Sequence, residues 1–313
     1  PADSRGKAGY QVRIGRDNLA DPIHVDSQAT PLHVKRFLDG RDKSRPFCMM
    51  LFFKSPHGPF GDWDPALVGA IKPRNIKFPD AATLANAERE PDIVKKSLGW
   101  PAGQTLLNKP KRHYKSIRDY YRSIASMDLG VGRVVDELKK RGLDQNTVVL
   151  FTSDNGHFSG EHGLGGKWLM YEPSLRVPGF LFDPRQPGGK TTDKMVVTTD
   201  FSTTMLALAG LDIPKEMSGR DLTTLYSNPT APWREDFLYD HPYGHGGKIP
   251  RTVGVRTETH TYTRYTDPNP PFEQLFDLRT DPDQLNNLAE NLEQAELLGR
   301  MRDRCDALLD ESK

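Results

Sequence analysis

The pattern of apolar and polar positions predicts alternating helices and strands in the first half of the chain. Apolar residues recur at helical spacing over 30–41, and a continuous apolar run, PFCMMLFF, follows at 46–53. Such a run is typical of a strand buried on both faces. The pattern then predicts a long amphipathic helix over 113–141, ended by Gly142, and a second buried strand over 147–153.

The intervening and following segments complete a predicted α/β domain. Residues 61–112 have no firm period and predict a long surface excursion with at most one short helix. Strand-like runs at 177–183 and 194–200 precede a predicted helix over 201–211. This order of elements predicts a mostly parallel sheet flanked by helices. The opening, to about residue 30, predicts little regular structure.

The pattern changes near residue 233. From there, short alternating or apolar pieces broken by polar turns predict a smaller antiparallel sheet, followed by a helix over about 287–311. We therefore expect two domains, a main α/β domain over 1–232 and a C-terminal α+β subdomain over 233–313.

Charge and composition narrow the class of partner. The chain has 43 basic and 42 acidic residues and a net charge of +1, so no global field recruits nucleic acid or an anionic membrane. No apolar run approaches the roughly 20 residues of a membrane span. We expect neither nucleic acid nor a membrane span, and any anion specificity must be local.

A first group of candidate residues follows the predicted strand over 147–153. Asp154 and Asn155, in SDNG, lie where a strand delivers side chains to the ligand edge of an α/β sheet. Their carboxylate and amide oxygens suit Ca²⁺ or Mg²⁺. Asp-Asn-Gly is also a common turn, so the pair alone leaves both interpretations open.

Two further signals favour an anion beside that cation. The Gly-rich stretch GEHGLGGK (160–167) lets the backbone approach a ligand closely, and Lys167 offers a positive charge; no nucleotide-binding loop motif is present. His57, in SPHGPF, follows the strand predicted over 46–53 and could bind an anion or protonate a leaving group, or be an ordinary packed residue. Together these residues favour hydrolysis of sulfate or phosphate esters.

The longer stretch FTSDNGHFSGEHGLGGKWLMYEPSLRVPGFLFDPR (151–185) resembles a signature region of the type I sulfatases, in the alkaline-phosphatase-like superfamily. RPFCMMLFFKSPHGPF, FSTTMLALAGLDIP and LFDLRTDPDQLNNLAE resemble other landmarks of these enzymes, so the resemblance covers about residues 30–290. It implies an alkaline-phosphatase-like fold and a sulfuric ester hydrolase, with a sulfated carbohydrate or another sulfate ester as substrate.

The resemblance also implies roles for individual residues. Asp154 and Asn155 match a pair that ligates a divalent ion, usually Ca²⁺. Lys167 matches a lysine that contacts the sulfate, and His57 a histidine near the ester oxygen, so both are candidate catalytic residues. His157 and His162 could face the substrate or be loop scaffolding.

A polar segment in the C-terminal part, DHPYGHGGKIPR (240–251), could line an open sugar subsite. Its candidate substrate-binding residues are His241, His245 and Arg251. The alternative interpretation is an ordinary surface loop.

One departure from the family pattern matters. Sulfatases carry a Cys or Ser in a [CS]xPxR motif that becomes formylglycine, the nucleophile, and an earlier Asp pair that adds metal ligands; neither is found in these residues. The chain thus resembles the C-terminal portion of a sulfatase. We expect it to be inactive alone, to bind Ca²⁺ weakly, and to be completed by a preceding segment or another copy of the chain.

Two alternatives remain open at this point. The first is a phosphonate or phosphodiester hydrolase of the same superfamily, and the second is a non-catalytic binding scaffold. A periplasmic or secreted location is favoured over a cytoplasmic one, because relatives that act on extracellular polysaccharides are usually exported.

Overall fold

The computed structural model describes residues 26–312, apart from 62, 68, 70, 73–75 and 187, so the prediction for the opening residues lies mostly outside the described part. The chain divides into two compact units. One comprises residues 1–77 and 114–147, and the other comprises residues 78–113 and 148–313. The second unit includes residues on both sides of 232, and the domain boundary expected there stays a prediction.

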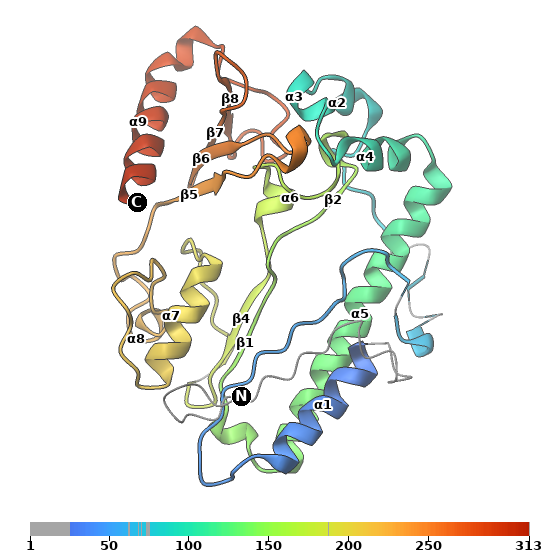
Figure 1. The fold of residues 1–313 in the computed structure, drawn as a ribbon, viewed down its shortest axis with the longest axis vertical. Helices are drawn as coiled ribbons and strands as arrows, with labels where there is room; N and C mark the ends of the chain where they lie inside the picture. The colour runs from blue at the N-terminus through green and yellow to red at the C-terminus, as the bar shows by residue number, and fades with distance from the viewer. Residues whose placement is uncertain are drawn as a thin grey trace. The chain divides into compact units, whose positions relative to one another are not determined.

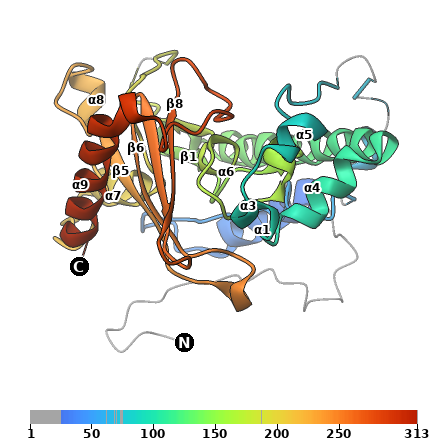
Figure 2. The same ribbon diagram turned by 90° about the horizontal axis from the view of Figure 1, so that it is seen from above.

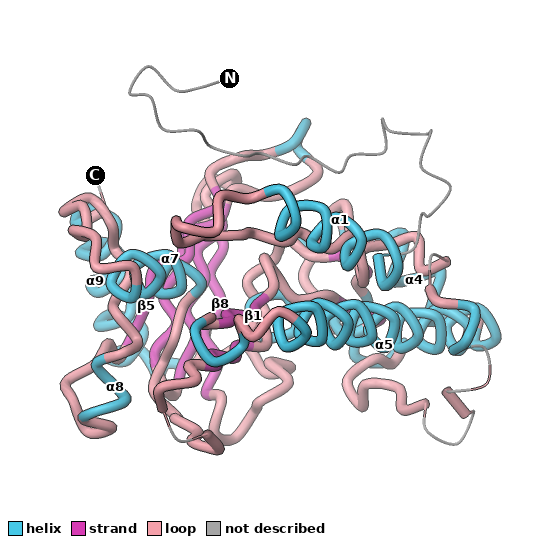
Figure 3. The backbone as a smooth tube through the Cα atoms, turned by 90° about the horizontal axis from the view of Figure 1, so that it is seen from below, coloured by secondary structure: helices cyan, strands magenta, loops and turns pink. Residues whose placement is uncertain are grey.

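The first unit is built on helix α1 (Asp26–Gly40), the 3-10 turn η1 (Pro65–Leu67), the greater part of α5 (Pro110–Lys140) and the 3-10 turn η3 (Asp144–Asn146). The helices α1 and α5 lie side by side (Figures 1 and 3). Arg133 Nη1 donates to the Ser27 carbonyl at 2.7 Å, and Arg141 Nη2 lies 2.6 Å from Asp39 Oδ1. Both helices predicted from the apolar periodicity in this unit are confirmed, although α1 begins four residues earlier than expected.

The strand predicted over 46–53 is wrong. Within the described residues this segment forms no ladder, and Met50 and Phe52 are 62% and 86% exposed. An apolar run becomes a buried strand only where neighbouring strands accept its backbone hydrogen bonds. The hydrophobic pattern of residues 46–53 could not reveal that, among the described residues, no neighbouring strand pairs with them.

The predicted excursion over 61–112 is more helical than expected. It contains α2 (Leu84–Glu88), α3 (Asp92–Lys95) and α4 (Trp100–Leu107). Each is short, so no periodic stripe is visible in the sequence, but local signals start them. Thr83 Oγ1 accepts from the Asn86 amide at 3.1 Å as an N-cap, and Pro101 lies in the first turn of α4.

Two small ladders in the second unit carry the Gly-rich region. Strand β1 (Val149–Thr152) pairs antiparallel with β4 (Gly179–Phe182), and β2 (Phe158–Ser159) pairs antiparallel with β3 (Gly165–Gly166). The 3-10 turn η4 (Glu161–Gly163) lies between β2 and β3, and helix α6 (Glu172–Leu175) lies between β3 and β4. The strands predicted over 147–153 and 177–183 are therefore confirmed, but the burial predicted for the first is not, because no residue of β1 is buried.

The strand predicted over 194–200 is wrong, because helix α7 (Thr198–Leu208) begins inside it. Asp200 Oδ2 accepts from the Val197 amide at 2.9 Å, which starts the helix and ends the extended run. The short helix α8 (Thr224–Ser227) follows.

The predicted C-terminal sheet and helix are confirmed. Strands β5 (Asp236–His241), β6 (Thr252–Thr257), β7 (His260–Tyr265) and β8 (Phe272–Asp277) form one antiparallel sheet in that order. The 3-10 turn η5 (His245–Gly247) lies between β5 and β6, and η6 (Leu292–Gln294) follows β8. Helix α9 (Ala295–Glu311) covers one face of the sheet (Figure 2). Across the three sheets of the described residues, every ladder is antiparallel.

The two faces of this sheet bury different partners. On one face, Val255 and Tyr262 pack with Leu298 and Met301 of α9. On the other, Tyr265 and Phe276 pack with residues of the Gly-rich region and of α3, namely Phe158, Leu164, Leu169, Tyr171 and Val94. The C-terminal sheet is therefore the platform on which the Gly-rich region is fixed.

None of the helices in the described part of the chain combines the length and apolarity that crossing a membrane requires.

Candidate functional site

The first wall of the candidate site is the turn that follows β1. Asp154 is exposed, and its Oδ1 accepts from the Asn155 amide at 2.9 Å. The turn is anchored by Gly156, whose amide donates to the Ser174 carbonyl of α6 at 2.8 Å. A Cβ on Gly156 would lie 2.1 Å from the Pro173 carbonyl oxygen, so only glycine permits this approach.

The second wall, here called the lysine segment, comprises Gly160–Tyr171. Its glycines are packed rather than flexible. Gly163 has φ +69°, and a Cβ there would meet Trp100, Ala87 and Gln104 at 2.6–2.8 Å. Gly103 of α4 packs equally closely on the Gly163 carbonyl, since its own Cβ would lie 2.1 Å from that oxygen. The glycines therefore allow the segment to lie directly against α2 and α4.

The two walls meet through Lys167. Its Nζ donates to Asn155 Oδ1 at 2.9 Å, across twelve residues of sequence. The structure thus brings together three of the residues singled out in the sequence, Asp154, Asn155 and Lys167.

These three residues line a cavity of about 2430 Å³ within the second unit. Its wall also includes Trp168, Tyr239 and His241. A hollow bounded by a carboxylate, an amide and an ammonium group can hold an anion together with a cation.

Trp168 is a feature that sequence reasoning missed. It has φ +87°, and for a bulky residue this left-handed backbone is a genuine outlier that costs about 1–3 kcal/mol. Its carbonyl accepts from the Tyr239 hydroxyl of β5 at 2.9 Å. Burial raises the pKa of Tyr239 to about 12, so the hydroxyl keeps its proton and donates at neutral pH.

His162 lies in the core, not at the cavity surface. It is fully buried, its Nδ1 lies 2.7 Å from Glu90 Oε1, and its ring stacks on Tyr171 with centroids 3.8 Å apart. The Tyr171 hydroxyl donates to Glu90 Oε2 at 3.0 Å, which completes a buried network. The substrate role considered for His162 therefore gives way to the scaffolding role, because a substrate does not reach the interior.

His157 and His57 are not part of this buried network and stay candidates. His157 is partly buried and lies between Asn155 and β2 in sequence. His57 belongs to the first unit, where it is exposed and its Nδ1 lies 2.7 Å from the Gly58 carbonyl oxygen.

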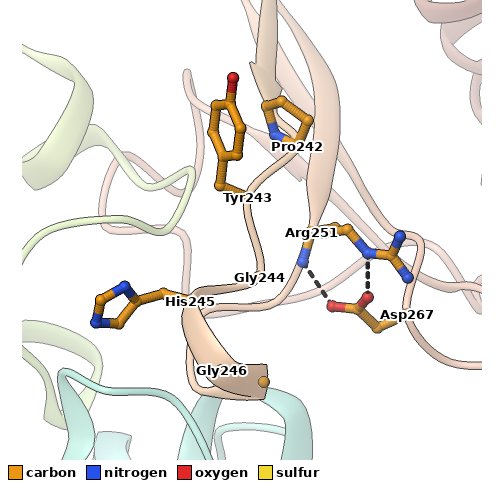
Figure 4. Close-up of a pocket in the computed structure, with 8 residues that line it drawn as sticks. Pro242, Tyr243, Gly244, His245, Gly246, Arg251 and Asp267 are labelled. Atoms are coloured by element: carbon orange, nitrogen blue, oxygen red, sulfur yellow. Dashed lines mark hydrogen bonds and ion pairs between the residues drawn. The ribbon is translucent and has the colours of Figure 1, made fainter.

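The C-terminal candidates divide between two places. His241, on β5, lines the large cavity. His245 and Arg251 line a separate open pocket with Tyr243 and Asp267 (Figure 4). Here the exposed loop is defined as Pro242–Lys248, and every residue of it except Gly244 is exposed.

Arg251 is held by a carboxylate beside this pocket. Its Nε lies 2.5 Å from Asp267 Oδ1, and its amide donates to Asp267 Oδ2 at 2.6 Å. Burial acts to raise the pKa of Asp267, but the hydrogen bonds from Arg251 outweigh it and leave that pKa below its usual range. Part of the positive charge of Arg251 is thus already neutralised.

Asp154 and Asn155 fit a hard-cation site in part. Both supply oxygen donors on the cavity wall, as Ca²⁺ prefers, but Ca²⁺ takes six to eight oxygens. In the part of the chain that the structure describes, no three His, Cys, Asp or Glu side chains gather as a metal site. Asp154 can therefore provide one ligand of a larger shell, and Asn155 can provide a second once the Lys167 ammonium group moves from its Oδ1 to an anion.

Comparisons with known protein families cover nearly the whole chain. A family model described as "Sulfatase" matches residues 5–211, and a model described as "N-sulphoglucosamine sulphohydrolase, C-terminal" matches residues 160–311.

Individual relatives are similar over more than four fifths of the chain. The N-acetylglucosamine-6-O-sulfatase of Bacteroides thetaiotaomicron is 27% identical over 83% of this chain and 57% of its own length. The arylsulfatase of Clostridium perfringens is 30% identical over 85% of this chain and 54% of its own length. The chain thus spans a little over half the length of these curated relatives.

Solved structures show the same fold. One, in complex with D-glucosamine-2-N,6-O-disulfate, superposes with a TM-score of 0.78 at 22% identity, over 92% of this chain and 70% of that one. The phosphonate monoester hydrolase of Agrobacterium radiobacter superposes with a TM-score of 0.76 at 21% identity, over 92% of this chain and 61% of that one. At these identities the likeness establishes the α/β, alkaline-phosphatase-like fold and no finer property.

Proposed function

This chain belongs to the sulfatase family, and on that premise we propose that the protein containing it hydrolyses the sulfate ester of a sulfated carbohydrate. The observation that carries the proposal is the contact between Lys167 Nζ and Asn155 Oδ1, which joins a cationic group to the two oxygen donors on one cavity wall. The carbohydrate is suggested by the relative named N-acetylglucosamine-6-O-sulfatase.

The residues of this chain would act mainly through charge. Lys167 would contact the sulfate and offset the negative charge that develops on its oxygens during ester cleavage. Asp154 and Asn155 would hold a divalent ion, Ca²⁺ or Mg²⁺, which when bound supplies further neutralisation of the sulfate. His57 would donate a proton to the departing alcohol oxygen.

The substrate's sugar would contact residues beyond this centre. His157, two residues from Asn155 in sequence, and His241, which lines the same cavity as Asn155, are the candidates. His245 and Arg251 line the open pocket and would bind a more distant part of a carbohydrate.

In this proposal the 313 residues supply only part of the active site. The formylglycine nucleophile and the remaining metal ligands would come from residues outside these 313, so the chain alone would be inactive and would bind Ca²⁺ weakly. Such a chain would be completed by a further segment or by another copy. Calorimetry that finds tight Ca²⁺ binding to the 313 residues alone would contradict this division, as would a stable, well-folded monomer on size exclusion.

A second candidate is hydrolysis of a phosphonate or phosphate diester, because a phosphonate monoester hydrolase shares the fold. The intact protein should be assayed with 4-nitrophenyl sulfate and 4-nitrophenyl phenylphosphonate, which share a leaving group. We expect faster hydrolysis of the sulfate and sulfate release from N-acetylglucosamine 6-sulfate. Faster hydrolysis of the phosphonate would favour the second candidate, and hydrolysis of neither would favour a non-catalytic scaffold.

A further inference from the structure

The backbone on both sides of Lys167 adopts an unusual conformation. Gly166 has φ +91° and Trp168 has φ +87°, so the lysine stands between two left-handed residues directly after the short strand β3. Glycine adopts this conformation at no steric cost, whereas a tryptophan does so only where its surroundings hold it.

Two contacts hold Trp168. Its indole ring lies over Gly166, because a Cβ on that glycine would be 2.9 Å from the ring. The Tyr239 hydroxyl donates to its carbonyl at 2.9 Å, from a strand 71 residues further along the chain. One contact comes from within the lysine segment and the other comes from the C-terminal sheet.

The chain on either side of these contacts is immobilised in the core. Leu164 is 1% exposed, and so are Leu169, Met170 and Tyr171. Lys167 itself is only partly buried, and it projects from this fixed segment to Asn155. The turn that Gly166 and Trp168 make sets the direction from which this side chain starts.

We infer that Trp168 and Tyr239 are positioning residues that fix the backbone of Lys167, so that its ammonium group stays beside the Asp154–Asn155 pair, where a bound anion would meet it. The ring over Gly166 fixes the direction in which the lysine leaves the backbone, and the hydroxyl of Tyr239 fixes the peptide that follows. This inference rests on the proposed function only for the identity of the anion, a sulfate ester. The placement of the lysine itself is independent of the reaction.

A positioning role differs from ordinary packing in what it changes. If Trp168 and Tyr239 only stabilised the fold, their loss would lower the free energy of unfolding and loosen the buried residues 169–171. If they position Lys167, their loss frees the ammonium group while residues 169–171 stay protected, and an interaction made in the transition state weakens.

The test uses the intact protein with Tyr239→Phe, which keeps the ring and removes the donor. Tyr243→Phe, in the exposed loop, is the matched control for labelling and hydrogen exchange. The rate at which acetic anhydride labels Lys167 is read by mass spectrometry against Lys248, and hydrogen exchange is followed over residues 169–171. We expect Tyr239→Phe to raise the labelling of Lys167 about 2- to 10-fold, the worth of one hydrogen bond, with exchange unchanged.

Steady-state kinetics provide the second measurement. In Tyr239→Phe, kcat for a sulfate ester should fall by a similar factor, about 2- to 10-fold, while KM stays the same. Trp168→Gly should show a larger change in both labelling and kcat, and Trp168→Phe, which keeps a ring over Gly166, should recover part of it.

The outcomes separate this inference from the proposed function. If Lys167 is labelled at the wild-type rate in both Tyr239→Phe and Trp168→Gly, the positioning role is wrong, whatever the activity. If labelling rises but no sulfate ester is hydrolysed even by the wild type, the positioning role stands and the proposed function fails. Loss of protection over residues 169–171 together with increased labelling would identify a packing role and also overturn the inference.

Discussion

The lysine segment and the exposed loop are both rich in glycine and histidine, yet they have opposite physical character. In the lysine segment, His162 is fully buried and Gly163 touches two helices, whereas in the exposed loop His245 is exposed and Gly246 has nothing within 4 Å of an added Cβ. The first is a preorganised wall and the second can adapt to a ligand. Catalysis needs fixed groups, while the binding of a distant part of a sugar does not.

The largest expected effect is that of removing the Lys167 ammonium group from the lysine segment, compared with removing a histidine from the exposed loop. Lys167→Ala should lower kcat/KM for 4-nitrophenyl sulfate about 10²- to 10³-fold, because it removes a preorganised donor to the developing negative charge. His245→Ala, from the exposed loop, is the control and should change it less than about 10-fold, a difference of 1.4 kcal/mol. Equal losses in the two variants would show that the lysine has no special place in the reaction.

A second experiment tests the packing difference directly with two left-handed glycines. Gly163→Ala should lower the free energy of unfolding by about 2–5 kcal/mol. The strained backbone costs about 1–2 kcal/mol, and overlap of the new methyl group with Trp100 and Ala87 adds about 1–3 kcal/mol. Gly246→Ala, at φ +65° in open space, should cost only the backbone part, about 1–2 kcal/mol. Urea unfolding of both variants gives the difference, and its absence would mean that the lysine segment yields as easily as the exposed loop.

A third experiment uses pH to examine the attachment of the lysine segment to the C-terminal sheet. Burial raises the pKa of Tyr239 from 10.0 to about 12, so between these values the unfolded chain loses a proton that the folded chain keeps. The stability from this group is complete below pH 10 and falls as pH rises towards 12, by up to about 3 kcal/mol.

The measurement is urea unfolding at several values between pH 9 and 12. Tyr239→Phe should lose less stability over this range than the wild type, since it has no proton to lose. The control Tyr243→Phe removes a hydroxyl from a tyrosine that is 77% exposed in the loop. An unchanged slope in Tyr239→Phe would show that this hydroxyl is not held in a buried site.

The smallest expected effect is in the pocket beside the exposed loop. Arg251→Ala breaks a pair whose side chains are 56% and 35% exposed, and such pairs contribute about 0–1 kcal/mol. The midpoint temperature of thermal unfolding should therefore change little. KM for a sulfated oligosaccharide should rise, whereas KM for 4-nitrophenyl sulfate should stay the same. A matched rise for both substrates would place Arg251 near the reacting sulfate instead.

Much of the C-terminal part could be predicted because its signals are local. Short alternating or apolar pieces broken by polar turns marked the sheet of strands β5 to β8, just as helical periodicity marked α5 earlier in the chain. The run over 46–53 shows the limit of the same method, because whether an apolar segment forms a strand depends on ladder partners that its own residues do not specify.

The sequence by itself determined which residue types carry the chemistry and that Asp154, Asn155 and Lys167 belong to one candidate site. Only the tertiary structure decided that His162 is scaffold and that Trp168 takes a left-handed backbone. Both depend on partners far along the chain, Glu90 for His162 and Tyr239 for Trp168. Burial and strain are properties of the packed surroundings, so a local pattern cannot encode them where the partner lies some 70 residues away.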